Sequence, residues 1–139
     1  MTNLDRAKGI LAEGHTCVLC KGEIVFITDE RGVKPLVEWY ESAINLCDFS
    51  AADKVVGRGA AFLYLLLGVC EVYAKVISES ALKLLQQHGI KVEYGEKAEC
   101  IINRKKDGIC PFECAVSEIE DPQAAYKEIC DKMRELKIR

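Results

Sequence analysis

The sequence lacks an excess of basic residues. Its 19 Lys and Arg stand against 22 Asp and Glu, which gives a formal net charge of −3. Nucleic-acid-binding domains usually carry a basic face. The aromatic residues, 7% of the chain, also do not alternate with basic residues as they do on base-stacking surfaces. We therefore expect no nucleic-acid partner.

The chain also lacks a long hydrophobic run. The longest apolar stretch, residues 60–67 followed by Val69 and Cys70, is too short to cross a bilayer. The first six residues lack the basic start and apolar segment of a secretion signal. We expect a cytoplasmic protein without a membrane partner. Its eight cysteines are a smaller fraction of the chain than in a small secreted disulfide scaffold, so they are expected to be free thiols.

Histidine is scarce as well. His15 and His88 are the only two, and they lie in a predicted loop and at a predicted helix C-terminus, so a Cys-His dyad has little support. By contrast, 50% of the residues are hydrophobic and 29% are charged. This balance is typical of a folded globular protein. We expect one domain over residues 1–139.

Hydrophobic spacing predicts alternating helices and strands. Lys21-Gly22 is predicted to be a hairpin turn, and Asp53 is predicted to be the N-cap of a long apolar helix. The predicted helices cover residues 3–13, 34–47, 54–67, 81–88, 122–136 and a segment starting at Pro111, and the predicted strands cover residues 17–20, 23–28, 70–77, 90–94 and 100–103.

A strand, helix and strand over residues 70–94 form a β-α-β unit, which requires parallel strands with helices across the sheet. The expected fold is a three-layer α/β/α sandwich around a mixed sheet of about five strands. Ligands of such sheets gather at the carboxyl ends of the strands. Here these corners are Asp53-Lys54, residues 78–80 and the loop after Asn103.

The order of elements resembles the cytidine-deaminase-like superfamily over residues 3–105. Five short motifs also stand out: Gly57-Arg-Gly-Ala-Ala61, Ser78-Glu-Ser80, His88-Gly-Ile90, Ile102-Asn-Arg104 and Cys110-Pro-Phe-Glu113. Through them the chain more closely resembles an uncharacterised family of small prokaryotic proteins assigned to that fold. This resemblance implies the sandwich fold, leaves the activity open and, together with the apolar stretch 60–70, implies a homodimer.

The zinc motifs of that superfamily are absent. Zinc deaminases place His-Ala-Glu or Cys-Ala-Glu on one helix and Pro-Cys-x-x-Cys on the next, because about three protein ligands hold the metal. The corresponding windows, residues 57–61 and 78–82, contain neither His nor Cys. We expect no metal and no cofactor, and a zinc deaminase with unusual ligands stays as one alternative.

The favoured hypothesis is binding of a small nucleotide-like or phosphorylated ligand at the carboxyl edge of the sheet. Glu79 is a candidate general base there, although a glutamate in a first helical turn also simply complements the helix dipole. Close helix packing is the alternative explanation of Gly57 and Gly59. The candidate ligand-binding residues are Asp53, Lys54, Gly57, Arg58, Ser78, Ser80, Asn103 and Arg104.

The alternative function is a thiol-dependent transferase, and whether the protein is an enzyme at all stays open. Cys110 precedes Pro111 as an N-cap would, so helix N–H groups would favour its thiolate and make it a nucleophile. Glu113 would orient it and Arg104 would stabilise an anion. A capping box without catalysis explains Cys110 and Glu113 equally well.

Whether the four cysteines Cys17, Cys20, Cys110 and Cys114 meet in space is open. Cys114 lies one helical turn after Cys110 and could serve as a resolving thiol or a metal partner. Cys17 and Cys20 are three positions apart on a predicted strand, so their side chains should point to opposite faces. A metal site shared by all four would need them to meet in space, which spacing does not decide.

Overall fold

The computed structural model describes residues 1–102 and 108–137, and it folds them into a mixed α/β arrangement. Six helices and five strands are present in these ranges. The helices are α1 (Asn3–Leu11), α2 (Lys34–Glu41), α3 (Arg58–Leu67), α4 (Glu79–Gln87), α5 (Pro111–Ala115) and α6 (Pro122–Glu135). The strands are β1 (Cys17–Lys21), β2 (Ile24–Thr28), β3 (Ser50–Val56), β4 (Glu71–Ser78) and β5 (Lys91–Ala98).

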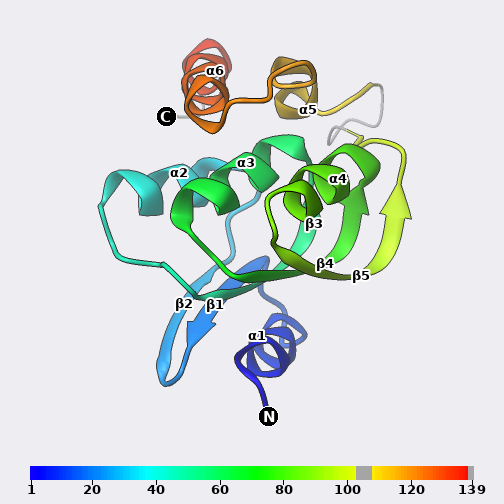
Figure 1. The fold of residues 1–139 in the computed structure, drawn as a ribbon. Coiled ribbons are helices and arrows are strands. Elements are labelled where there is room, and N and C mark those ends of the chain that lie inside the picture. The colour runs from blue at the N-terminus through cyan, green and yellow to red at the C-terminus, as the bar shows by residue number, and fades with distance from the viewer. Residues whose placement is uncertain (103–107, 138–139) are drawn as a thin grey trace.

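The strands form one sheet in the order β2-β1-β3-β4-β5. β1 pairs antiparallel with β2 and β3, whereas β3, β4 and β5 run parallel. Helix α1 lies on one face of the sheet, and α2, α3 and α4 lie on the other (Figure 1). Helices α5 and α6 pack against α3. The predicted three-layer sandwich with a mixed five-stranded sheet is confirmed.

The prediction for residues 50–56 is wrong. These residues were expected to be a connector followed by a helix with Asp53 as its N-cap, but they form β3 at the centre of the sheet. β3 pairs on one side with β1 and on the other with β4, and these two ladders outweigh the helical spacing of its apolar residues. The helix starts only at Arg58, after Gly57 as N-cap.

Two other predicted boundaries differ. The expected strand over residues 100–103 is reduced, within the described residues, to an isolated bridge between Ile102 and Ile109. β5 is the longer strand instead and extends to Ala98. Helix α2 ends at Glu41 rather than at residue 47, because Ala43 has a φ of 60° and cannot continue a right-handed helix.

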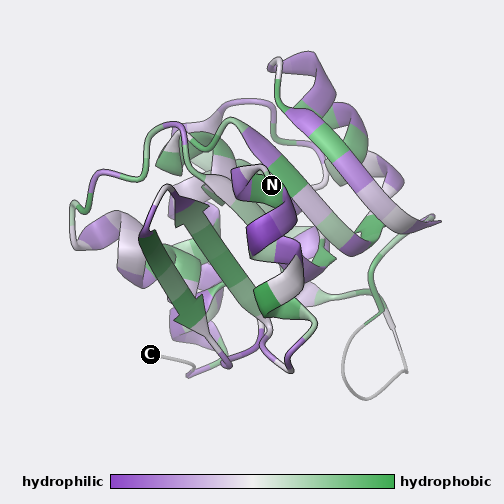
Figure 2. Cartoon of the chain, turned by 90° about the horizontal axis from the view of Figure 1, so that it is seen from below, coloured by the Kyte–Doolittle hydropathy of each residue, from purple (hydrophilic) through white to green (hydrophobic). Residues whose placement is uncertain are grey.

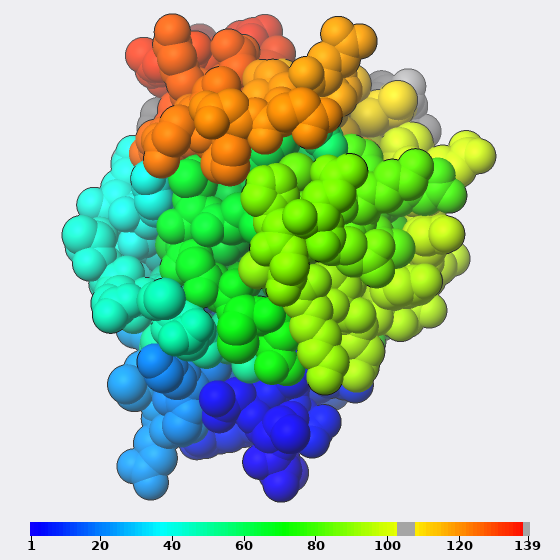
Figure 3. Space-filling model, viewed as in Figure 1, coloured from blue at the N-terminus to red at the C-terminus, as the bar shows by residue number. Residues whose placement is uncertain are grey.

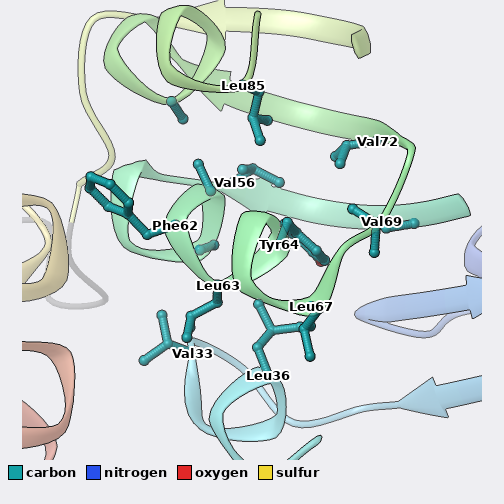
Figure 4. Close-up of a cluster of buried hydrophobic side chains, with 14 of the residues drawn as sticks. Val33, Leu36, Val56, Phe62, Leu63, Tyr64, Leu67, Val69, Val72 and Leu85 are labelled. Atoms are coloured by element: carbon teal, nitrogen blue, oxygen red, sulfur yellow. The ribbon is translucent and has the colours of Figure 1, made fainter. Parts of the chain in front are cut away.

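The main core lies between the sheet and α3. Phe62, Leu63 and Tyr64 are fully buried, since α3 contacts strands on one side and α2, α4 and α6 on others. In Figure 4 these side chains point away from α3 in different directions, with Leu63 directed toward Val33 and Leu36. The expectation that this helix is buried on several sides is confirmed, and the burial of its apolar surface stabilises the fold.

A smaller core lies on the opposite face, where α1 packs on β1 and β3. Cys20 is buried here, whereas Cys17 is buried in the main core, so the two thiols do point to opposite faces. In the space-filling view α1 lies at one end of the molecule and the α5–α6 segment at the other (Figure 3). No helix in the described ranges is long and apolar enough to cross a membrane.

Candidate functional site at the carboxyl edge of the sheet

A buried carboxylate occupies the carboxyl edge of the sheet. Glu113 on α5 is only 7% exposed, and its Oε1 accepts hydrogen bonds from the backbone N–H of Arg58 at 2.5 Å and the hydroxyl of Ser78 at 2.9 Å. Its Oε2 accepts from the N–H of Ile101 at 3.3 Å. The N-terminus of α3 is thus an anion-binding position, and the protein fills it with its own side chain.

The side chain of Arg58 ties the segment between α5 and α6 to the same edge. Its Nε donates to the carbonyl of Val116 at 2.9 Å, and its Nη2 donates to the carbonyl of Ile119. Nη1 donates to the Oγ of Ser80 at 3.1 Å, and Glu120 forms an ion pair with the guanidinium at 3.5 Å. Arg58 is itself 7% exposed, so these bonds replace water around a buried charge.

The absence of side chains at Gly57 and Gly59 explains how α5 comes so close to the start of α3. A Cβ added at Gly57 would lie 2.8 Å from Oε1 of Glu113, and one added at Gly59 would lie 3.2 Å from Cβ of Phe112. Both distances are shorter than ordinary carbon contacts. The expected close approach at this helix start is therefore present, and the element that approaches is α5.

Substituting Gly57 tests this packing. Gly57→Ala is expected to destabilise the protein by about 1–3 kcal/mol, because the new methyl group overlaps the Glu113 carboxylate. Gly9→Ala is the matched control: Gly9 lies inside α1 with no atom within 4 Å of an added Cβ, so a small gain in stability is expected. Urea unfolding of both variants measures the difference, and equal effects would contradict the packing argument.

Five predicted site residues meet at this edge, and others do not. Glu79 is exposed and forms a long ion pair with Lys97 at 3.9 Å, away from the buried carboxylate. Lys54 is exposed on β3, not at a helix N-terminus. Asn103 and Arg104 lie outside the described residues. The residues brought together are Gly57, Arg58, Ser78, Ser80 and Glu113.

Cys110 is the N-cap of α5, as predicted, but without the expected capping box. Its side chain makes no capping hydrogen bond, and α5 has only five residues. The sulfur is half-buried and packs against the main core. Both oxygens of Glu113 bind Arg58, Ser78 and Ile101 instead of orienting Cys110. The nucleophile role of Cys110 stays a prediction.

Sequence reasoning missed a buried polar cluster beneath this edge. The Tyr64 hydroxyl donates to Oδ2 of Asp53 at 2.6 Å and lies 3.1 Å from the sulfur of Cys17. Burial raises the pKa of Asp53 to about 6, against the lowering effect of the Tyr64 hydrogen bond. Burial also raises the pKa of the Cys17 thiol well above its usual value, so this thiol is uncharged at neutral pH. Cys17 and Asp53 are direct neighbours across β1 and β3. This pairing could not be found because residues 50–56 were not predicted to be a strand.

Within the described ranges no group of three or more His, Cys, Asp or Glu side chains is arranged to hold a metal ion. The two windows compared with the zinc motifs, residues 57–61 and 78–82, hold Arg58, Ser78 and Ser80, all engaged in hydrogen bonds within the protein. The described residues of the edge therefore do not fit a catalytic zinc, which needs about three N, S or O ligands.

The fold and the edge together define an α/β sandwich protein whose carboxyl edge is closed by its own C-terminal segment. The chain belongs to the TM1506 family, a domain of unknown function (DUF1893), whose model matches residues 6–133. A crystal structure of a DUF1893 family protein from Thermotoga maritima is similar, with a TM-score of 0.85 and 30% identity over 95% of this chain and 91% of that chain. A search of curated proteins finds no match. The expected membership of an uncharacterised family is confirmed.

Proposed function

We propose that the protein binds a small nucleotide-like or phosphorylated ligand at the carboxyl edge of the sheet, without zinc-dependent deamination. The observation that carries this proposal is the convergence of three donors, from Arg58, Ser78 and Ile101, on one carboxylate. A phosphate or carboxylate of a ligand can accept the same three bonds.

Binding at this position requires Glu113 to leave. Its carboxylate is an internal competitor, so the ligand binds only the fraction of molecules in which α5 has moved from the edge, and the apparent affinity is reduced by that fraction. The ligand would therefore bind weakly to the resting protein. Arg58, which holds the segment after α5, controls the same opening.

Removing the competitor tests the proposal. We expect Glu113→Gln to bind AMP and inorganic phosphate about tenfold more tightly than the wild type, because the neutral amide competes less well for the donors. Adding Ser78→Ala to that variant should weaken binding again. Glu118→Gln, an exposed change on the same segment, should leave binding as in the wild type. Calorimetry measures all four proteins, and absence of binding in both the wild type and Glu113→Gln would end the proposal.

The fold assignment within this proposal is cytidine-deaminase-like. A helix, a hairpin, an Ala- and Gly-rich helix and a parallel β-α-β unit follow one another in the structure, which supports it. The single domain, the cytoplasmic location and the homodimer expected from the sequence belong to the same proposal. Sedimentation at micromolar concentration tests the homodimer directly.

A further inference from the structure

The face of the sheet that carries α1 is only partly covered. Figure 2 looks at this face and shows α1 crossing part of the sheet, and β5 is exposed at most of its positions. Beside α1 lies a cavity of about 450 Å³, within the range of small-molecule sites. Three lysines, Lys8, Lys54 and Lys75, line it together with Tyr73 and apolar residues at the end of α1. This "lysine cavity" lies across the sheet from α3 and α4.

The lysine cavity has a strong excess of positive charge. No acidic residue is among its lining residues. The ammonium of Lys8 pairs with Glu93 and lies 4.7 Å from the centre of the Tyr73 ring. Lys54 and Lys75 have no ion-pair partner in the part of the chain that the structure describes. Two charges in the cavity are thus left without compensation by the protein.

The strand register places these two charges side by side. Asp53 pairs with Ala74 and Val55 with Val76, so Lys54 on β3 is level with Lys75 on β4. Like charges at neighbouring positions of a sheet destabilise it. An anion bound between the two ammonium groups would attract both of them and outweigh their mutual repulsion.

The wall of the cavity also offers a hydroxyl group. Tyr73 is half-buried, and its hydroxyl has no hydrogen-bond partner among residues 1–102 and 108–137. Gly95 lies beside it on β5: an added Cβ would come within 2.9 Å of the Lys75 carbonyl oxygen and 3.7 Å of the Tyr73 hydroxyl. Glycine at this position therefore keeps a side chain away from the phenol.

We propose that the lysine cavity binds a small organic phosphate with at least two negative charges. Lys54 and Lys75 form ion pairs with its phosphate oxygens, and the Tyr73 hydroxyl donates to one of them. The apolar end of α1, including Leu11, contacts the organic part. This site is separate from the carboxyl edge, shares no residue with the Glu113 network and does not need α5 to move.

Calorimetry with inorganic pyrophosphate at constant ionic strength tests the proposal. We expect saturable binding to the wild type, a loss of about tenfold in affinity in Lys54→Gln and in Lys75→Gln, and no detectable binding in the double variant. Lys83→Gln is the matched control, because Lys83 is an exposed lysine on α4, across the sheet. Absence of saturable binding to the wild type, or an equal loss in Lys83→Gln, would overturn the proposal.

Stability without the ligand gives a second readout. Lys54→Gln and Lys75→Gln remove a repulsion, so each variant should unfold at the same temperature as the wild type or at a higher one. Pyrophosphate should raise the unfolding temperature of the wild type but not that of the double variant. Pyrophosphate binding that persists in the double variant and is weakened by Ser78→Ala would place the anion at the carboxyl edge, and would overturn the lysine cavity while supporting the proposed function.

Discussion

Glu113→Ala is expected to lower the free energy of unfolding by about 3–5 kcal/mol. The substitution leaves two buried donors, the N–H of Arg58 and the hydroxyl of Ser78, and the part-buried N–H of Ile101 without an acceptor. It also releases α5 from the start of α3. Because a domain of this size is stable by only about 5–15 kcal/mol, the loss should be visible as a large fall in the urea midpoint.

Two variants separate this effect from a general loss of surface charge. Glu113→Gln keeps an acceptor for part of the network and should lose less than Glu113→Ala. Glu118→Ala removes an exposed glutamate five positions later and should change stability by no more than about 0.5 kcal/mol. If Glu113→Ala and Glu118→Ala unfolded at the same urea concentration, the Glu113 network would have no structural importance.

The layers of the fold could be predicted from the sequence, because they depend on local periodicity. The β-branched run of β4, the helix stopped by Gly89 and the following strand define a parallel unit without any tertiary information. β3 could not be recognised in this way. Its residues Ser50–Val56 alternate poorly, and only the two flanking strands make it a strand. Long-range pairing of this kind leaves a weak local signal.

Part of the candidate site could also be predicted from the sequence. Arg58, Ser78 and Ser80 were placed at one edge by the rule that parallel strands share a carboxyl end, and that rule holds. The partner of these residues, Glu113, was linked to Cys110 instead, because capping rules act within four residues. The actual contacts of Glu113 span 35 and 55 positions along the chain.

The lysine cavity could not be predicted, because the sequence did not show which side chains of its helix and strands share one face of the sheet. Lys54 was placed at a helix start, and Lys75 lies between the apolar residues Ala74 and Val76 of β4. A lysine between the apolar residues of a central strand is the signal that could have been used, since lysine is depleted in strands. It became informative only once the register placed the two lysines level.

Asp53→Asn is expected to make stability less sensitive to pH between about 4 and 7. The pKa of Asp53 is raised to about 6 in the folded protein, from an ordinary value of 3.8. A raised carboxyl pKa means that the folded protein holds a proton that the unfolded chain has already released. Its contribution to stability is complete below pH 3.8 and is lost as the pH rises through about 6. At pH 7.5 this loss amounts to at most about 3 kcal/mol.

The side-chain amide of the Asp53→Asn variant has no proton that titrates in this range. The difference in unfolding free energy between the variant and the wild type should therefore shift in favour of the variant from pH 4 to pH 7.5. Urea unfolding across this range measures it, and a carboxyl ¹³C titration should show the Asp53 midpoint near 6. Tyr64→Phe removes the hydrogen bond that holds the Asp53 pKa down, so it should move that midpoint to higher pH. A midpoint near 4 in the wild type would show that burial does not control this carboxyl group, and a midpoint that Tyr64→Phe leaves in place would show that the Tyr64 hydrogen bond does not lower it.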